Sequence, residues 1–485
     1  MSTGSSSTSG RRVPDPRLPV RAGQVLRVRT VWAIPLVLGS AVVAIIAALY
    51  IGSAVNPLAN LSGLPVAVVN QDRGAAVGSQ RLQVGRQVQS GLLSSPAVSG
   101  RLHLEALTLP EAEQVMGRGG LYATLVIPAN FTTSLLNVAG LRAPGGAAGA
   151  AAPQVEILTN QRAGSIGANL AAGTLQPALA AASRQIGHHL AALVPPSAQT
   201  GATKVLLANP VTVTTVPYRP LPPNSALGSS AFYVALLTLI CGFLAATIVH
   251  SAVDSALGYA TNEVGPHWRQ RRPVPINRWQ TLLIKWAIVA VLTGVVTAVM
   301  LAVAAGGLGM DAPDPVLLWA YCWLCAASVG IGTIALFAMA GGFGQLIALL
   351  LFVYAGLASA GGTVPLEALP GFLRAVSNVE PLRQVLAGTR SILYFGAQAA
   401  AGLTRGAVAA ASGLVFWLLI GTLVVKWYDR RRFYRLDPDL IAYVNKSADS
   451  YRARQAASQT GQQAGAARPD RDPGQPKSGR AGGEP

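Results

Sequence analysis

Charge is scarce in this sequence of 485 residues. Only 12% of the residues are Asp, Glu, Lys or Arg, whereas 51% are hydrophobic. Soluble globular domains carry about 25% charged residues. The mean hydropathy is +0.43, and a chain of this length with so few charges cannot cover its surface with polar groups. The shortage excludes an ordinary soluble enzyme and a disordered protein, and it indicates an integral membrane protein.

The sequence also lacks the motifs of common enzyme chemistry. It contains no GxxxxGK[ST] phosphate-binding loop, no GxSxG motif and no HExxH motif. The adjacent pair His188-His189 is a poor joint metal site, because neighbouring residues on a helix point in different directions. We therefore expect no enzyme activity, no cofactor and no metal site in this chain.

Cysteine is rare as well. Cys241, Cys322 and Cys325 all lie inside apolar segments. A disulfide framework or a redox CxxC motif needs water access and partners, whereas free cysteine is usually a buried apolar residue. We expect three buried thiols.

Acidic residues number 19 against 37 basic ones, which gives a net charge of +18. Nucleic-acid binding is one explanation of such a charge. However, many of the basic residues flank apolar segments, as the topology of a membrane protein requires. We expect the lipid bilayer as a partner, and no nucleic acid.

Long apolar runs are abundant, and about 20 apolar residues suffice to span a bilayer. Six segments are expected to cross it: 31–52, 229–250, 279–305, 316–340, 345–361 and 410–427. The first segment starts late and runs long for a cleavable signal peptide, so we interpret it as an uncleaved anchor.

The basic residues predict the orientation of these segments. They cluster in three regions: 1–30, 251–278 and 428–485. The loop 306–315 holds no basic residue and carries Asp311 and Asp314. The positive-inside rule then predicts a multi-pass protein of the plasma (inner) membrane with both termini in the cytoplasm. Composition predicts disorder from about residue 446.

Residues 53–228 differ from the rest of the chain and would lie outside the cytoplasm. Five short β-branched runs predict strands: 64–70, 102–108, 121–128, 154–159 and 211–216. Residues 129–137 and 161–194 predict helices. The expected fold class is a polytopic α-helical membrane protein with six transmembrane helices and an extracytoplasmic α+β domain between helices 1 and 2.

Charge inside the apolar segments is almost absent. Lys285 lies near the cytoplasmic end of the third segment, where it either snorkels to the interface or forms a functional ion pair. Asp254, at the inner mouth of the second segment, is the nearest carboxylate. This shortage of intramembrane carboxylates disfavours a proton-coupled exporter.

The stretch 362–409 predicts an outer re-entrant segment. Prolines break any continuation of the fifth span, and the interleaved apolar and basic residues after them predict one or two short amphipathic helices in the outer leaflet. An ordinary outer loop is the alternative. The candidate residues of this hairpin are Pro365, Glu367, Pro370, Arg374, Pro381 and Arg383.

Two motifs in this stretch, VPLEALPGFLR (364–374) and PLRQVLAGTRSILY (381–394), resemble the closing signature of ABC-2 type permeases. Three outer motifs resemble the YhgE/Pip branch of that superfamily, which consists of bacterial membrane proteins mostly of unknown function: LPVAVVNQDRGAAVG (64–78), GLYATLVIPANFTTSLL (120–136) and ILTNQRAG (157–164). The resemblance covers roughly residues 30–445.

This resemblance implies a homodimeric ABC-2-like permease component that exports a hydrophobic, lipid or drug-like substrate with a separately encoded ATP-binding subunit. Relatives in the branch include phage-infection proteins and a type VII secretion component. The resemblance therefore leaves an alternative, a non-transporting surface or secretion-machinery scaffold of the phage-receptor or type VII secretion accessory type.

An ATPase partner would dock on the cytoplasmic loop 251–278, which is the only long inner loop between spans. The loop offers a short predicted helix, an aromatic side chain and a basic cluster: Trp268, Arg269, Arg271 and Arg272. The alternative is a plain positive-inside flank.

Overall fold

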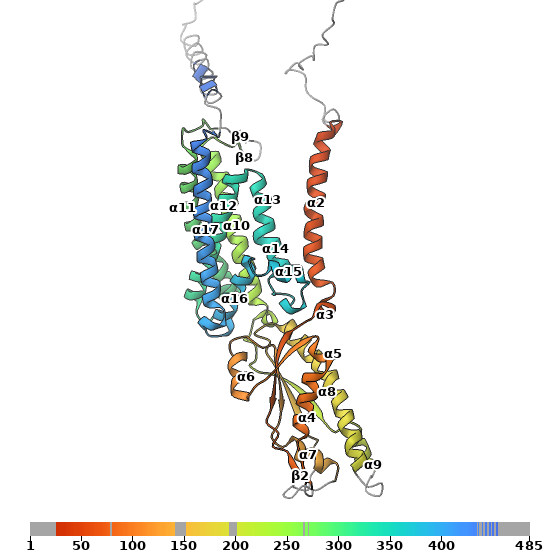
Figure 1. The fold of residues 1–485 in the computed structure, drawn as a ribbon. Helices are drawn as coiled ribbons and strands as arrows, with labels where there is room; N and C mark the ends of the chain where they lie inside the picture. Colours follow the sequence, from red (N-terminus) through yellow and green to blue (C-terminus); the bar gives the residue numbers. More distant parts are fainter. Residues whose placement is uncertain are drawn as a thin grey trace, which may run out of the picture.

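The computed structural model describes residues 26–77, 80–140, 152–193, 201–264, 267–269 and 271–433, and single positions up to 453. A bundle of long helices stands on an α/β domain (Figure 1). The bundle end that leads to both termini is called the tail side, and the end that carries the α/β domain is called the domain side. Most of the basic region 1–30 and of the expected disordered tail lies outside the described residues.

Five helices of the described chain are long and apolar enough to cross a membrane. They are α2 (Arg29–Ala54), α10 (Ser230–Ala256), α11 (Arg278–Leu301), α12 (Pro315–Ala340) and α17 (Leu403–Arg430). A π-helical turn, η3 (Ala302–Gly307), continues α11. The chain is therefore a helical membrane protein.

The remaining expected span is shorter. α13 (Phe343–Leu349), the π-helical η4 (Leu350–Tyr354) and α14 (Ala355–Ser359) form a single apolar run. This run leads from the tail side to the domain side (Figure 1). Its length is at the lower limit for a bilayer-spanning helix.

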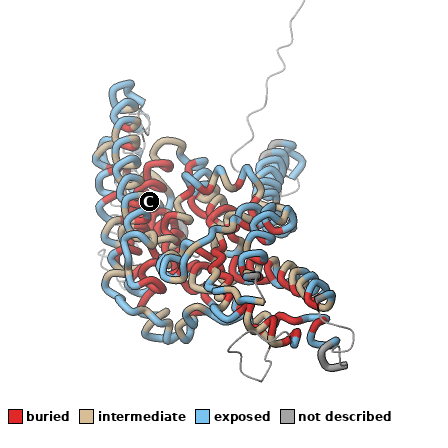
Figure 2. The backbone as a smooth tube through the Cα atoms, turned by 60° about the horizontal axis from the view of Figure 1, so that its bottom comes forward, coloured by how far each residue is buried: buried red, intermediate tan, exposed pale blue. Residues whose placement is uncertain are grey.

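Helix α12 occupies the centre of the bundle, where glycines permit close packing. A Cβ atom on Gly330 would lie 2.6 Å from a methyl carbon of Val289 in α11 and 3.1 Å from the carbonyl oxygen of Gly242 in α10. The indole of Trp286 donates a hydrogen bond to the Ile331 carbonyl oxygen at 3.2 Å. Buried residues are concentrated in the interiors of the bundle and of the α/β domain (Figure 2).

The α/β domain contains a five-stranded mixed sheet in the order β4-β1-β5-β6-β7. Its strands are β1 (Leu64–Asn70), β4 (Leu102–Ala106), β5 (Ala123–Ile127), β6 (Gln154–Thr159) and β7 (Thr212–Pro217). β5 and β6 pair antiparallel, whereas the other neighbours are parallel. All five predicted strands are found, with ends shifted by at most two residues. The small hairpin of β2 (Ala75–Val77) and β3 (Gln80–Leu82) was not predicted.

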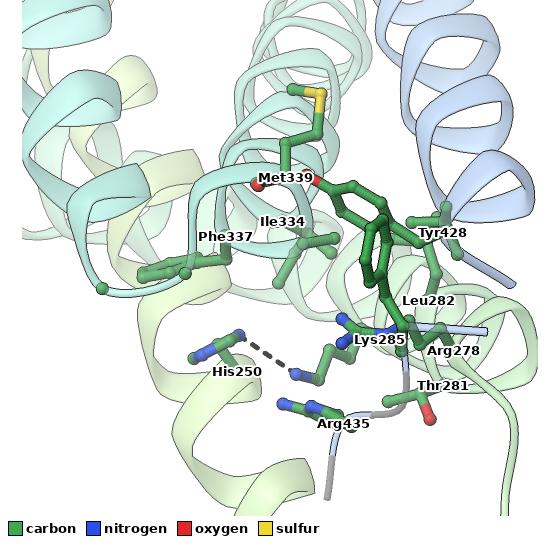
Figure 3. A pocket seen from close by; sticks show the side chains of 15 residues that line it. His250, Arg278, Thr281, Leu282, Lys285, Ile334, Phe337, Met339, Tyr428 and Arg435 are labelled. Atoms are coloured by element: carbon green, nitrogen blue, oxygen red, sulfur yellow. Dashed lines mark hydrogen bonds between the residues drawn. The ribbon is translucent and has the colours of Figure 1, made fainter. Parts of the chain in front are cut away.

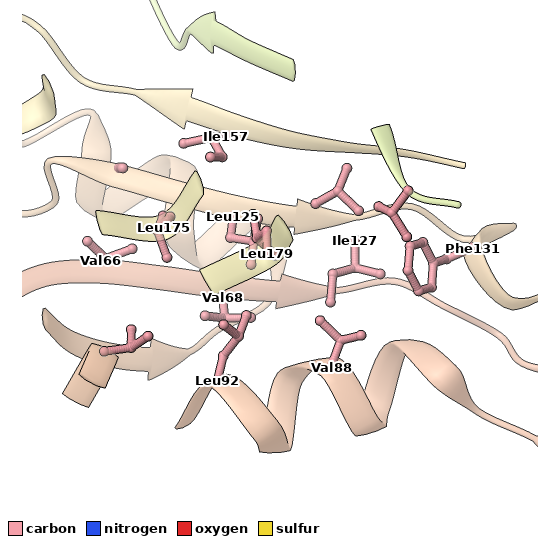
Figure 4. Close-up of a cluster of buried hydrophobic side chains, with 14 of the residues drawn as sticks. Val66, Val68, Val88, Leu92, Leu125, Ile127, Phe131, Ile157, Leu175 and Leu179 are labelled. Atoms are coloured by element: carbon pink, nitrogen blue, oxygen red, sulfur yellow. The ribbon is translucent and has the colours of Figure 1, made fainter. Parts of the chain in front are cut away.

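Helices cover both faces of this sheet. The helices of the domain are α3 (Pro57–Asn60), α4 (Val84–Ser94), α5 (Pro96–Ser99), α6 (Leu109–Met116), α7 (Phe131–Val138), α8 (Ser165–Leu193) and α9 (Gly201–Ala208). On one face, leucines of α8 and α4 pack onto the valines of β1 (Figure 4). On the other face, Ala112 and Met116 of α6 pack against Ala67 and Val69. Because both faces are buried, β1 is apolar throughout rather than alternating.

A single carboxylate fixes the loops at one end of the sheet. Asp72 follows β1, and its Oδ1 accepts hydrogen bonds from the backbone N–H groups of Gly74 (3.2 Å) and Thr132 (3.0 Å). Its Oδ2 accepts from the Gly85 N–H (3.0 Å) and the Thr132 hydroxyl (2.5 Å). Asp72 therefore joins the starts of α4 and α7 to the end of β1.

Candidate functional site

Prolines define the segment on the domain side between α14 and α17. Pro365 precedes the short helix η5 (Leu366–Ala368), and Pro370 is the N-cap of α15 (Gly371–Val376). Pro381 begins α16 (Pro381–Tyr394). Proline is suited to the first turn of a helix, where its missing N–H would be unpaired in any case. The segment therefore forms two α-helices, α15 and α16, where the sequence predicted one or two.

The first part of this segment is tied to the α/β domain. The Arg374 guanidinium donates to the Ser62 hydroxyl at 3.2 Å and to the Glu367 carbonyl oxygen at 2.9 Å. The same carbonyl accepts from the Ser62 N–H at 2.9 Å. Burial raises the pKa of the Glu367 carboxyl. These bonds hold the segment against the chain that leads from α2 into the sheet.

The start of α16 is capped by Glu380, a buried residue that sequence reasoning missed. Its carboxylate accepts from the Leu382 N–H and, at 2.9 Å, from the Arg383 N–H. Burial raises the pKa of Glu380 to about 7, although these hydrogen bonds and Arg383 act in the opposite direction. Arg383 donates to Ser377 (2.9 Å) and Asn378 (2.8 Å), and burial lowers its pKa. An acidic residue directly before a proline is a recognisable helix-start pattern.

Helix α16 is built into the bundle rather than laid on its surface. The Tyr321 hydroxyl of α12 donates to the carbonyl oxygens of Gln384 (3.2 Å) and Val385 (3.1 Å). A Cβ atom on Gly388 would lie 2.3 Å from the Tyr321 hydroxyl oxygen. Leu373 and Leu382 are buried, whereas Phe372 and Val379 are exposed. The apolar face of α16 packs on α10, α12 and α17. The position of these helices in the outer leaflet stays a prediction.

A cleft of about 1280 Å³ opens between α12, η4, α16 and α17, and we call it the domain-side cleft. Its apolar walls include Val329, Leu351, Phe352, Phe416 and Trp417. Its polar lining includes Arg118, Asn378, Gln384 and Arg405.

The charged and amide side chains and the aromatic rings occupy different levels of the cleft. Arg405, in the first turn of α17, donates from Nε to Gln384 Oε1 at 2.7 Å. Trp417 lies twelve residues further along the same helix, which is about 18 Å at the helical rise per residue. The charged and amide side chains of the lining therefore lie nearer the α/β domain and its aromatic rings lie deeper in the bundle, an arrangement that suits an amphiphilic molecule. Both levels also carry small or apolar residues, such as Val379 and Ala409.

On the tail side, the predicted short helix in 251–278 is wrong. The loop forms an antiparallel hairpin of β8 (Asn262–Val264) and β9 (His267–Arg269). Gly265 and Pro266 stand between these strands in the sequence, and both residue types are unfavourable inside a helix.

The structure describes the four candidate docking residues only in part. The backbones of Trp268 and Arg269 belong to β9. Arg272 forms an ion pair with Asp449 of the C-terminal segment, whereas Arg271 is exposed. The chain's own tail thus already engages one of them.

Of the two alternatives for Lys285, the structure shows an ion pair rather than snorkelling. Its side chain is 5% exposed, and its Nζ lies 2.6 Å from Oδ1 of Asp254 in α10. Arg435, beyond α17, bonds to the other oxygen of Asp254. The sequence could not show this ion pair because it depends on how α10, α11 and the segment after α17 meet.

The remaining expectations from the sequence concern cysteines and metals. Cys322 and Cys325 are buried, Cys241 is partly buried, and all three thiols are free. His188 and His189 are exposed on α8. Among the residues that the structure describes, no cluster of potential metal ligands is found.

Comparison with solved structures finds a domain assigned to an ABC type-2 transporter of Thermotoga maritima MSB8. The match has 17% sequence identity, covers 34% of this chain and 95% of that one, and has a TM-score of 0.22. Such a score is too low to assign a fold. A search of curated proteins finds no match.

A family model does match, over residues 34–415. Its match runs from α2 into α17 and so includes the α/β domain, the proline-rich segment and most of the domain-side cleft. The chain therefore belongs to the family described as "Protein of unknown function (DUF3533)".

Proposed function

We propose that this protein is a permease component that moves a hydrophobic, lipid or drug-like substrate outward, and that the domain-side cleft binds this substrate. The observation that carries the proposal is the division of the cleft into a part with the aromatic rings of Phe352, Phe416 and Trp417 and a part with the polar side chains of Gln384 and Arg405. An amphiphile could leave its apolar body among the aromatic rings while its head group bonds to Arg405. The sequence resemblance to ABC-2 type permeases of the YhgE/Pip branch supports the same role.

In this proposal the tail side faces the cytoplasm and the α/β domain lies outside the inner membrane. The distribution of basic residues along the sequence supports this orientation. The run 343–359 would be the fifth of six spans. At about 26 Å it is slightly shorter than a hydrocarbon core of about 30 Å, a mismatch that local thinning of the bilayer can absorb.

The proposed permease would work with two partners. A separate ATP-binding subunit would supply energy, because the sequence has no phosphate-binding loop, and it would dock at the β8–β9 hairpin. A second copy of the chain would complete a homodimer. The apolar surface of α2 supports the second point, since Val37, Val43 and Ile51 are more than half exposed.

Filling the cleft tests substrate binding directly. Gly413 lines the cleft on α17, whereas Leu419 on the same helix is 59% exposed and lies outside it. The purified protein in nanodiscs containing a diazirine-labelled phosphatidylglycerol should cross-link at Phe416 and Trp417. Gly413→Trp should abolish these cross-links, and Leu419→Trp should leave them intact. Equal cross-linking in both variants would show that the lipid does not enter the cleft.

A second experiment separates the permease from the scaffold alternative. Cross-linking in native membranes should recover an ATPase, and Trp268→Ala should reduce that recovery without affecting membrane insertion. The charge of Arg271 would act mainly on the rate at which the ATPase encounters the loop. The effect of removing this charge should therefore depend on the salt concentration. If no ATPase is recovered and Trp268→Ala has no effect, the non-transporting scaffold is the better proposal.

A further inference from the structure

A second cavity, of about 460 Å³, lies on the tail side between the ends of α10, α11, α12 and α17. Figure 3 shows nitrogen-bearing side chains meeting there from three elements: His250 from α10, Lys285 and Arg278 from α11, and Arg435 from the segment after α17. We call it the tail-side cavity. It shares no lining residue with the domain-side cleft.

The only carboxylate bonded to these side chains in the described structure, Asp254, is already paired with two cations. Lys285 Nζ lies 2.6 Å from its Oδ1, and Arg435 bonds to its Oδ2. Lys285 Nζ also lies 3.0 Å from His250 Nδ1. If that nitrogen accepts, the neutral imidazole carries its proton on Nε2, which lies 3.4 Å from Asp254 Oδ2. One ammonium proton of Lys285 is then left without an acceptor in this cluster.

Arg278 adds a cation that has no ion-pair partner among the described residues, although Asp429 lies close enough to act on it electrostatically. Its Nε donates to the Phe433 carbonyl oxygen at 2.8 Å, and its guanidinium lies 5.5 Å from the centre of the Tyr428 ring. Within the described part of the chain, no carboxylate lies within ion-pair distance of Arg278. Three cations therefore face one carboxylate, and the cavity carries surplus positive charge together with unused hydrogen-bond donors.

The positive-inside rule alone does not explain this arrangement. That rule requires charge near the cytoplasm, which solvated side chains satisfy. Here the side chains of Lys285 and Asp254 are only 5% and 7% exposed. Charges removed from water are costly unless they are paired and hydrogen-bonded, so surplus cations beside such a buried pair call for an anion.

We propose that the tail-side cavity binds a phosphate-type oxyanion whose oxygens accept hydrogen bonds from Arg278, Lys285 and Arg435. Guanidinium groups match the geometry of phosphate oxygens. The apolar wall that includes Ile334 and Phe337 would contact the organic part of the ligand. The phosphate can belong to a soluble phosphorylated compound or to the head group of an anionic phospholipid. The proposal does not depend on transport through the domain-side cleft.

Arg278→Gln is the most direct test, because it removes a cation of the cavity without breaking an ion pair. Arg271→Gln is the matched control, since Arg271 is exposed on the same side and does not line the cavity. Inorganic phosphate is titrated into delipidated protein in neutral detergent by calorimetry. In parallel, nanodiscs with mixed phosphatidylglycerol and phosphatidylcholine are analysed by native mass spectrometry for retained lipid.

Saturable phosphate binding that Arg278→Gln weakens at least tenfold, with Arg271→Gln unchanged, would identify a soluble phosphate compound as the ligand. Selective retention of phosphatidylglycerol that only Arg278→Gln abolishes would identify the lipid head group. Either result supports the proposal, and equal behaviour of the two variants towards both ligands overturns it. If Arg278→Gln does not fold, hydrogen exchange of the wild-type protein decides. Protection around the start of α11 by either ligand supports the site, and no protection by either overturns it.

Discussion

Helices α2 and α12 are both apolar, and they occupy opposite situations. α2 has a mean hydropathy of 2.5 in its most apolar window, none of which is buried in the chain. α12 has the lower value of 1.9, and 78% of its window is buried. The more hydrophobic helix is thus the less packed one. Hydropathy predicts that a helix enters a bilayer, but it does not predict which helix forms the centre of the bundle.

Small and hydroxylated residues explain why α12 is packed inside the bundle and α2 is not. α12 carries Ser328, Gly330, Gly332 and Thr333 within one and a half turns, all of them buried. Small residues let neighbouring backbones approach, which is the main source of helix packing inside a membrane. α2 has mostly Val, Leu, Ile and Ala along its length. It contacts the rest of the chain at Leu49, which packs on the group of Ala358, Leu369 and Leu373.

The largest expected effect comes from adding a side chain at the centre of α12. Gly330→Leu would place atoms 2.6 Å from Val289 and 3.1 Å from the Gly242 carbonyl oxygen, so helices would have to separate. We expect a loss of more than about 3 kcal/mol and little folded protein. Gly39→Leu in α2 meets nothing within 4 Å and should express normally. Size-exclusion profiles of both variants in detergent check this, and similar profiles would contradict the packing described for α12.

Removing the Asp72 carboxylate should be the next largest effect. Asp72→Ala leaves the N–H groups of Gly85 and Thr132 without their acceptor, and we expect about 2–3 kcal/mol of destabilisation, confined to the α/β domain. Glu156→Ala, at an exposed position on β6, is the control. Hydrogen exchange should show faster opening of β1, α4 and α7 in Asp72→Ala and an unchanged α12. Opening of the whole bundle would show that the two regions are not independent.

A smaller effect depends on pH and involves Glu380. Its pKa is raised from the ordinary 4.5 to about 7, so the folded protein binds a proton that the unfolded chain has released between these values. Stability from this group is therefore fully present below pH 4.5 and is lost as the pH rises to about 7. Glu380→Gln should flatten this part of the profile of thermal unfolding against pH. Glu156→Gln should retain this pH dependence. The same slope of unfolding temperature against pH in the wild-type protein and in both variants would assign the dependence to other groups.

The smallest effect concerns the contact of α2. Leu49→Ala removes a side chain packed beside Leu373, and we expect about 1 kcal/mol because the site is only partly buried. Val43→Ala, at a position 65% exposed, should have almost no effect on the unfolding temperature. If Val43→Ala proves the more destabilising, another surface covers α2 in the solubilised protein.

The positions of helices and strands were predictable because the spacing of apolar residues and the length of apolar runs determine them locally. The five predicted strands and the long helix over α8 are examples, whereas the β8–β9 hairpin was missed because two three-residue strands carry little local signal. Residues that work through distant partners could not be predicted. Asp72 bonds to Thr132 sixty residues away, and Lys285 pairs with Asp254 across two helices. Likewise, Arg405 and Gln384 meet in the domain-side cleft only because α16 packs against α17.

The proposed export through the domain-side cleft requires the tail side to face the cytoplasm and the domain side to face outward. Thiol labelling measures this orientation directly. Ser99 in the α/β domain and Ser447 in the C-terminal segment are both exposed, so single cysteines there can react in a background without the three native ones. With a membrane-impermeant maleimide on intact cells, we predict labelling of Ser99→Cys, and labelling of Ser447→Cys only after lysis. Labelling of Ser447→Cys but not of Ser99→Cys in intact cells would reverse the orientation and contradict an outward-facing domain-side cleft.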